Sequence, residues 1–192
     1  LIVMPIAING SGTVTGISVG GLPDGIVDAD MLAANAVTAA KLASGVGGKV
    51  LQVVIAQTDT QASTSSSTFS EITTDLRATI VPTSATSKII VDVSLYLSSN
   101  AQTGSLRILK DGSTMVSGAT TSGSYDSDAT AYYAANWMGT LNRFVFETAG
   151  NTNSRYYTPF WNCNTNTVYL NRYQASATYL GTSSIRVMEV AA

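Results

Sequence analysis

The chain has 192 residues, and only 11% of them are charged, against roughly 25% in an ordinary soluble domain. Its formal net charge is −2, with no run of like charges that would attract a phosphate backbone or an anionic membrane surface. No apolar run approaches the roughly 18 residues of a membrane-spanning helix. We therefore expect neither nucleic acid nor a membrane among its partners.

Residue types that serve in catalysis are scarce. The sequence has no histidine, which excludes Ser-His-Asp and Cys-His mechanisms and histidine ligands to zinc. The one cysteine, Cys163, cannot form an internal disulfide, and we interpret it as a small buried hydrophobe. Nearly all carboxylates are expected in turns or on the surface, and the Asp126-Ser127-Asp128 triplet lacks the further ligands of an EF-hand calcium loop. The sequence thus predicts no enzyme, no cofactor and no metal site.

The N-terminal segment is repetitive and poor in large apolar residues. Residues 9–25 have the glycine-rich pattern of extended chain with turns, and residues 26–33 then align with 36–43 in a pseudo-repeat. Each unit has too few apolar side chains to offset the roughly 1–2 kcal/mol of backbone entropy lost per ordered residue. We predict an extended trimeric stalk in which copies share a thin core. Its core residues would be Val27, Leu32, Val37 and Leu42. A flexible linker, or a short helix over 30–43, is the alternative.

The segment 44–48 is glycine-rich and predicts a boundary between an N-terminal part, residues 1–48, and a head domain, residues 49–192. Within the head, alternation of period two predicts strands, most strictly over 88–97 and again over 72–80 up to Pro82. The Asp111-Gly112 dipeptide predicts a type I′ hairpin turn between strands 106–110 and 113–116. Further strands are predicted at 49–56, 131–139, 141–147, 155–161, 168–173 and 184–190.

Short strands of this number, separated by turns rich in Ser, Thr, Gly and Asn, indicate an all-β, antiparallel head, a β-sandwich of jelly-roll type. An isolated sandwich has exposed edge strands, and few charges protect them here. We therefore expect subunit contacts to cover those edges.

The chain resembles the fibre proteins of bacteriophages. Residues 9–23 and 36–42 resemble the repetitive shafts of tail-fibre and virion-fibre proteins. Residues 49–54, 80–91, 107–112 and 183–189 resemble the terminal domains that follow such shafts. The resemblance implies a homotrimer on the surface of the virion, joined to other tail, adaptor or capsid proteins through residues 1–48, with a head that contacts the host surface.

The length departs from that pattern, because long tail fibres have an N-terminal attachment domain and a much longer shaft. Two alternatives therefore stay open beside a short tail or head fibre. One is a capsid decoration or cement protein. The other is a glycan depolymerase, for which Asp126 and Asp128 are the obvious candidates.

Aromatic residues gather late in the sequence, and aromatic rings stack on the apolar faces of sugars. A site for a host cell-surface glycan is therefore predicted from a small set of residues. They are Tyr125, Tyr132, Tyr133, Trp161, Asn162 and Asn164. The competing interpretation is that these aromatics fill the core of the sandwich or the trimer interface.

Overall fold

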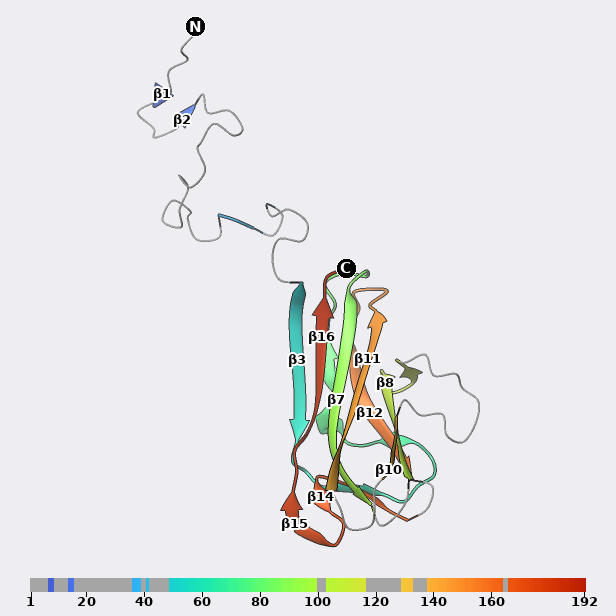
Figure 1. Ribbon diagram of the computed structural model, residues 1–192. Helices are drawn as coiled ribbons and strands as arrows, with labels where there is room; N and C mark the ends of the chain where they lie inside the picture. Colours follow the sequence, from blue (N-terminus) through green and yellow to red (C-terminus); the bar gives the residue numbers. More distant parts are fainter. Residues whose placement is uncertain are drawn as a thin grey trace. The chain divides into compact units, whose positions relative to one another are not determined.

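The computed structural model (Figure 1) describes residues 7–8, 14–15, 36–38, 41, 49–99, 103–116, 129–132, 138–163 and 166–192. The chain divides into two units, Leu1–Gly47 and Gly48–Ala192. The division lies one residue before the boundary that the sequence predicts. In the first unit, β1 (Ala7–Ile8) pairs antiparallel with β2 (Val14–Thr15).

The second unit consists of strands and one 3-10 turn, η3 (Thr74–Leu76), and its described residues contain no α-helix. The strands are β3 (Val50–Thr58), β4 (Ala62–Thr64), β5 (Ser70–Glu71), β6 (Ala78–Ile80), β7 (Lys88–Ser99), β8 (Thr103–Lys110), β9 (Thr114–Met115), β10 (Ala129–Tyr132), β11 (Met138–Thr148), β12 (Arg155–Cys163), β13 (Val168–Leu170), β14 (Arg172–Tyr173), β15 (Ser176–Leu180) and β16 (Ser183–Val190).

These strands form two six-stranded sheets and a separate hairpin (Figure 1). The β8–β12 sheet has the order β10-β8-β12-β5, with β6 also on β12 and β9 also on β8. The β7–β16 sheet has the order β3-β16-β7-β13-β4, with β11 also on β7. Strands β14 and β15 pair with each other. Every described pairing is antiparallel, so the predicted all-β, antiparallel class is confirmed.

Side chains of both sheets fill one hydrophobic core. In β7, alternate residues from Ile89 to Leu95 are fully buried, which confirms the strand and the face that the alternation predicted. The β8–β12 sheet contributes Leu106, Ile108 and Tyr157 to the same core. Cys163 is buried as expected. A strand with one face in this core has its other face directed away from it, because neighbouring residues point to opposite sides of a sheet.

The predicted turn at Asp111-Gly112 is also confirmed. Both residues have positive φ angles, 51° and 68°, as a type I′ turn requires. Strands β8 and β9 pair across the turn. The Asp111 carboxylate accepts a hydrogen bond from the backbone N–H of Tyr156 at 3.0 Å, which ties the turn to β12.

Four predicted strands differ from the structure, three of them as follows. The stretch 72–80 is not one strand, because η3 interrupts it. The Thr73 hydroxyl accepts the backbone N–H of Asp75 and caps this turn, so only β6 is extended. The predicted break between 131–139 and 141–147 is also wrong, since β11 pairs with β7 without interruption through Gly139 and Thr140.

The predicted strand 168–173 is interrupted by Asn171, which is fully buried and has a φ of 55°. Its amide donates to the carbonyl oxygens of Thr58 at 2.9 Å and Thr60 at 3.1 Å. Its side-chain oxygen accepts from the hydroxyl of Ser183 at 2.6 Å. One side chain thus joins the end of β3, the start of β16 and the β13–β14 corner.

We expect Asn171→Ala to destabilise the fold by about 2–4 kcal/mol, because it leaves buried hydrogen-bonding groups unpaired and puts a Cβ-bearing residue without a local hydrogen bond in the left-handed region. Urea unfolding at fixed protein concentration measures the change. Asn166→Ala is the matched control, since Asn166 also has a positive φ, 69°, but is exposed. Equal losses in the two variants would show that the backbone conformation alone matters.

Candidate functional site: an apolar sheet face and a tyrosine cluster

The face of the β7–β16 sheet that points away from the core is apolar towards the end where β3 and β7 begin. The register places Val53 opposite Met188, Met188 opposite Ile90, and Ile90 opposite Phe146. This gives an unbroken apolar row across β3, β16, β7 and β11. Val53 is 49% exposed and Phe146 is 62% exposed.

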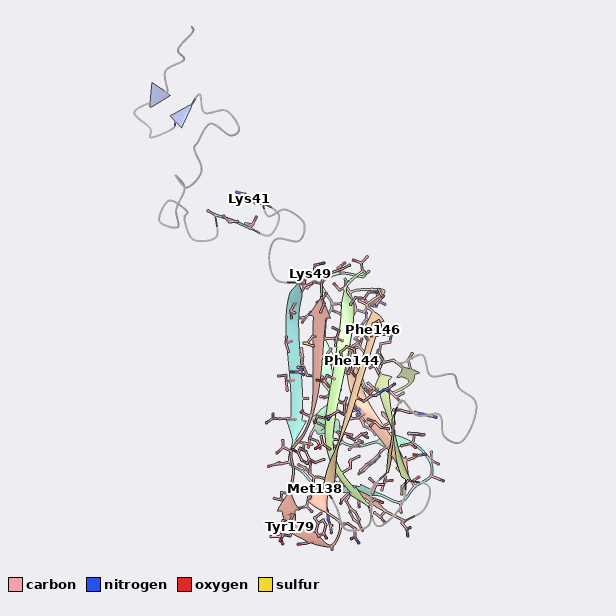
Figure 2. All side chains as sticks on the ribbon, in the orientation of Figure 1. Lys41, Lys49, Met138, Phe144, Phe146 and Tyr179 are labelled. Atoms are coloured by element: carbon pink, nitrogen blue, oxygen red, sulfur yellow. The ribbon has the colours of Figure 1, made fainter. Side chains whose placement is uncertain are left out.

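The adjacent row on the same face has apolar ends and a neutral centre. Ile55 on β3 and Phe144 on β11 are 61% and 56% exposed. Between them, Arg186 of β16 forms an ion pair with Asp92 of β7. The charges of that pair cancel, and the rings of Phe144 and Phe146 lie 6.4 Å apart. The position of these two phenylalanines along β11 is seen in Figure 2.

The apolar surface continues onto the edge strand β3. This strand pairs only with β16 among the described residues, and its sequence contains neither a charged residue nor proline. Its residues Val50 and Leu51 are 53% and 44% exposed. β3 is an edge strand of nine residues without charged residues or proline, so its backbone can pair, or its side chains can pack, with another chain. We call the whole surface the apolar face. It comprises Val50, Leu51, Val53, Ile55, Ile90, Phe144, Phe146 and Met188.

A row of polar side chains limits the apolar face on one side. The register aligns Gln57 with Ser184, Ser184 with Ser94, and Ser94 with Asn142. These residues follow the Ile55–Phe144 row in the direction away from Lys49. The apolar face therefore ends within the sheet and does not extend to its far end.

Beyond the polar row lies a group of tyrosines. Tyr96 is on β7, and Tyr169 of β13 pairs with Ser98 two residues further along β7, so both side chains lie on the face that points away from the core. Tyr173 and Tyr179 come from the β14–β15 hairpin, and their rings meet edge to face with centroids 5.8 Å apart. Figure 2 shows Tyr179 at the opposite end of the unit from Lys49. We call these four residues the tyrosine cluster.

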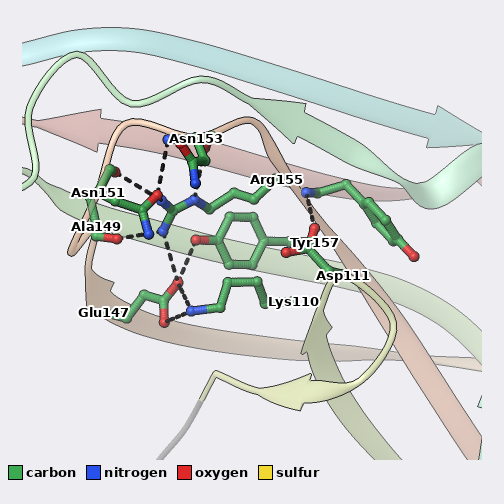
Figure 3. Close-up of polar contacts among 9 residues, drawn as sticks. Lys110, Asp111, Glu147, Ala149, Asn151, Asn153, Arg155 and Tyr157 are labelled. Carbon is green, nitrogen blue, oxygen red and sulfur yellow. Dashed lines mark hydrogen bonds and ion pairs between the residues drawn. The ribbon is translucent and has the colours of Figure 1, made fainter.

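Nearly all carboxylates were expected in turns or on the surface, and two of them lie deeper. Glu147 is partly buried: its carboxylate accepts the hydroxyl of Tyr157 at 2.6 Å and pairs with the Lys110 ammonium at 2.9 Å (Figure 3). Burial raises the pKa of Tyr157, with the Glu147 hydrogen bond as the second cause. The phenol is therefore held as a neutral donor to Glu147.

Arg155 completes this cluster from the start of β12. Its guanidinium lies 4.0 Å from the Glu147 carboxylate and donates to the carbonyl oxygens of Ala149 and Asn151, at 2.5 and 2.8 Å (Figure 3). The Asn151 side-chain oxygen also accepts from it, at 2.6 Å. Arg155 is 5% exposed. All these contacts fix the loop between β11 and β12, so we assign the cluster a structural role.

Glu189 lies deeper than Glu147 and has no exposed surface. It accepts hydrogen bonds from the side-chain amide of Gln52 at 2.5 Å and from the N–H and hydroxyl of Thr83, both at 2.8 Å. Burial disfavours its charged form, but these donors outweigh burial and lower its pKa to about 2. A glycosidase needs two facing carboxylates, whereas Glu147 and Glu189 are each held by separate sets of donors.

The predicted glycan residues do not come together as one surface in the described part of the chain. Trp161 is 4% exposed and belongs to the hydrophobic core, opposite Leu106 of β8. Asn162 is buried and donates its amide to the carbonyl oxygen of Ser67 at 3.0 Å. These two residues are therefore occupied inside the head, as the competing interpretation held. Tyr132 lies in β10, and its side chain is outside the described residues, as are Tyr125, Tyr133 and Asn164.

The remaining candidate residues lie in the N-terminal unit or in the 117–128 segment. Val37 is 49% exposed within its own chain. Val27, Leu32 and Leu42 are outside the described residues, and so are Asp126 and Asp128. Sequence reasoning missed the apolar face, although β3 carries large apolar residues at both alternating positions, which is the signal that could have revealed it.

No protein-family model matches the chain, and no curated protein matches it. Within the described residues, no helix is long and apolar enough to span a membrane. The same residues contain no group of three or more acidic or cysteine side chains that could hold a metal ion.

Proposed function

We propose that this protein is a structural, non-enzymatic subunit of a bacteriophage particle, a short trimeric fibre of the tail or head. Its two six-stranded sheets would stack as a β-sandwich of jelly-roll type. Residues 1–48 would form the stalk and dock to another virion protein. The observation that carries the proposal is the apolar face, on a chain with few charges overall.

An apolar face of this size is expected to have a partner. Its six most exposed side chains offer roughly 600 Å² of apolar surface, at the upper end of what ordinary monomers expose. Stable interfaces bury about 800 Å² per partner, and the stalk would supply further contacts. Three copies that pack these faces about one axis make a closed assembly, which does not grow into a filament.

The first test is the mass of the full chain in solution. Sedimentation equilibrium should give about 60 kDa, three times the chain mass of 20.0 kDa. A well-folded species of 20.0 kDa, with the N-terminal unit present, would contradict the proposal.

The second test is the location of the protein on phage particles. Gold-labelled antibodies against the head should mark the particle surface in electron micrographs. Label on the tail would identify a tail fibre, and label over the capsid would identify a head fibre or a decoration protein. If the antibodies labelled no part of intact particles, the proposed role in the virion would be contradicted.

A further inference from the structure

The tyrosine cluster differs chemically from the apolar face, although two of its members, Tyr96 and Tyr169, lie on the same side of the β7–β16 sheet as that face. Tyr179 is 65% exposed and Tyr96 is 37% exposed. Each ring combines an apolar surface with a hydroxyl that can donate or accept a hydrogen bond. The polar row from Gln57 to Asn142 separates the cluster from the apolar face. The two surfaces are therefore suited to different partners.

A cation is part of the cluster. The Arg172 guanidinium lies over the ring of Tyr169, with its central carbon 4.6 Å from the ring centroid. Its hydrogen bonds to the carbonyl oxygens of Tyr173 and Gln174 are long, at 3.5 and 3.4 Å. Arg172 forms no ion pair with a carboxylate among the described residues. The guanidinium thus provides a positive charge at the half-buried ring of Tyr169, within the segment that leads to Tyr173.

The hairpin that carries the cluster is fixed to the sheet by several contacts. The Ser98 hydroxyl donates to the carbonyl oxygen of Arg172 at 2.6 Å, and the Gln61 amide donates to that of Ala177 at 3.1 Å. Gly181 packs directly on Tyr96, since a Cβ at position 181 would lie 2.7 Å from the Tyr96 Cβ. A surface held in this way loses little conformational entropy when it binds a ligand.

We infer that the tyrosine cluster, with Arg172, is a binding site for a saccharide that carries carboxylate groups. Pyranose rings present apolar faces that stack on tyrosine, and their hydroxyls match the phenol groups. Arg172 would pair with a sugar carboxylate, because a guanidinium matches the two oxygens of that group. The inference extends the host-contact role of the proposed function, and it identifies residues that differ from those predicted from the sequence.

The test compares binding of the full-length protein to immobilised polysaccharides. The probes are alginate and pectate as uronate polymers, dextran and cellulose as neutral polymers, and the purified outer polysaccharide of the host bacterium. The wild-type protein should bind at least one carboxylated polysaccharide. Tyr179→Ala should weaken that binding roughly tenfold, the ratio that corresponds to about 1.4 kcal/mol. Tyr179→Phe should retain most of it, because the stacking ring remains.

Arg172→Gln tests the contribution of the charge, because it removes the guanidinium and leaves the tyrosine rings in place. It should weaken binding to the carboxylated probes. Added salt should also weaken the binding of the wild-type protein, because salt screens the attraction between opposite charges. Binding only to neutral probes, or to none, would overturn the inference. So would equal binding by wild type and Tyr179→Ala. Sedimentation of the same samples tests the proposed function separately. A trimer that binds no carboxylated saccharide would contradict the binding site alone. A single subunit would contradict the proposed trimeric fibre.

Discussion

Phe146→Glu is expected to convert the proposed trimer, of about 60 kDa, into single folded subunits of 20.0 kDa. Phe146 is 62% exposed in one chain, so the substitution should change the stability of the isolated head by no more than about 0.5 kcal/mol. In the proposed trimer, the same position is covered by another copy. A carboxylate there would be buried without a partner, at a cost of several kcal/mol for each subunit.

Asn142→Glu is the matched control for this experiment. Asn142 lies on the same strand and the same face as Phe146, but in the polar row. Sedimentation should show the wild-type mass for Asn142→Glu and the subunit mass for Phe146→Glu, with unchanged circular dichroism in both. A Phe146→Glu protein of wild-type mass would show that copies associate through another surface.

The parts of the fold that the sequence predicts well are those determined by neighbouring residues. The buried side of β7 follows from strict alternation, and the turn at Asp111-Gly112 follows from two residues that tolerate positive φ. Each of these features depends on a few consecutive positions, so one sequence is sufficient to infer it.

Other features depend on residues that are distant in the sequence. Trp161 was a glycan candidate because it is aromatic, but its burial is decided by β8 and β5, which pair on its two sides. Glu147 is charged and was expected at the surface, but it lies on the same side of β11 as the buried Val145. Lys110, Arg155 and Tyr157 approach it there from other strands. The tyrosine cluster likewise joins residues of β7, β13 and the β14–β15 hairpin, and Asn171 stands between β13 and β14 with a positive φ.

Glu189→Gln is the substitution expected to have the second large effect, a loss of stability, because its hydrogen-bonding groups would not match those around it. The carboxylate oxygens accept four described hydrogen bonds, from Gln52, Thr83 and Ser84. Glutamine replaces one of these acceptors with an NH₂ group, which would face a donor inside the protein. We expect a loss of about 2–4 kcal/mol in the free energy of unfolding at pH 7.

Glu189 should also make the free energy of unfolding depend on pH. The pKa of Glu189 is about 2 in the folded protein and 4.5 for the unperturbed group, so between these values the unfolded chain binds a proton that the folded chain does not. Stability from this group is therefore complete above about pH 5 and is lost as the pH falls towards 2. A shift of this size corresponds to about 3 kcal/mol. Glu189→Gln should remove this part of the pH dependence.

Urea unfolding from pH 2 to 7, at one protein concentration, measures both effects. Glu71→Gln is the control, because the pKa of Glu71 is also lowered, chiefly by its hydrogen bond with Arg77, but Glu71 is only partly buried and the Arg77 side chain is 40% exposed. Surface pairs contribute little to stability, so this variant should lose less than about 1 kcal/mol and retain the steep region below pH 5. If Glu189→Gln retained the wild-type slope there, acid sensitivity would have to come from other carboxylates, and the Glu189 hydrogen bonds would not stabilise its charge.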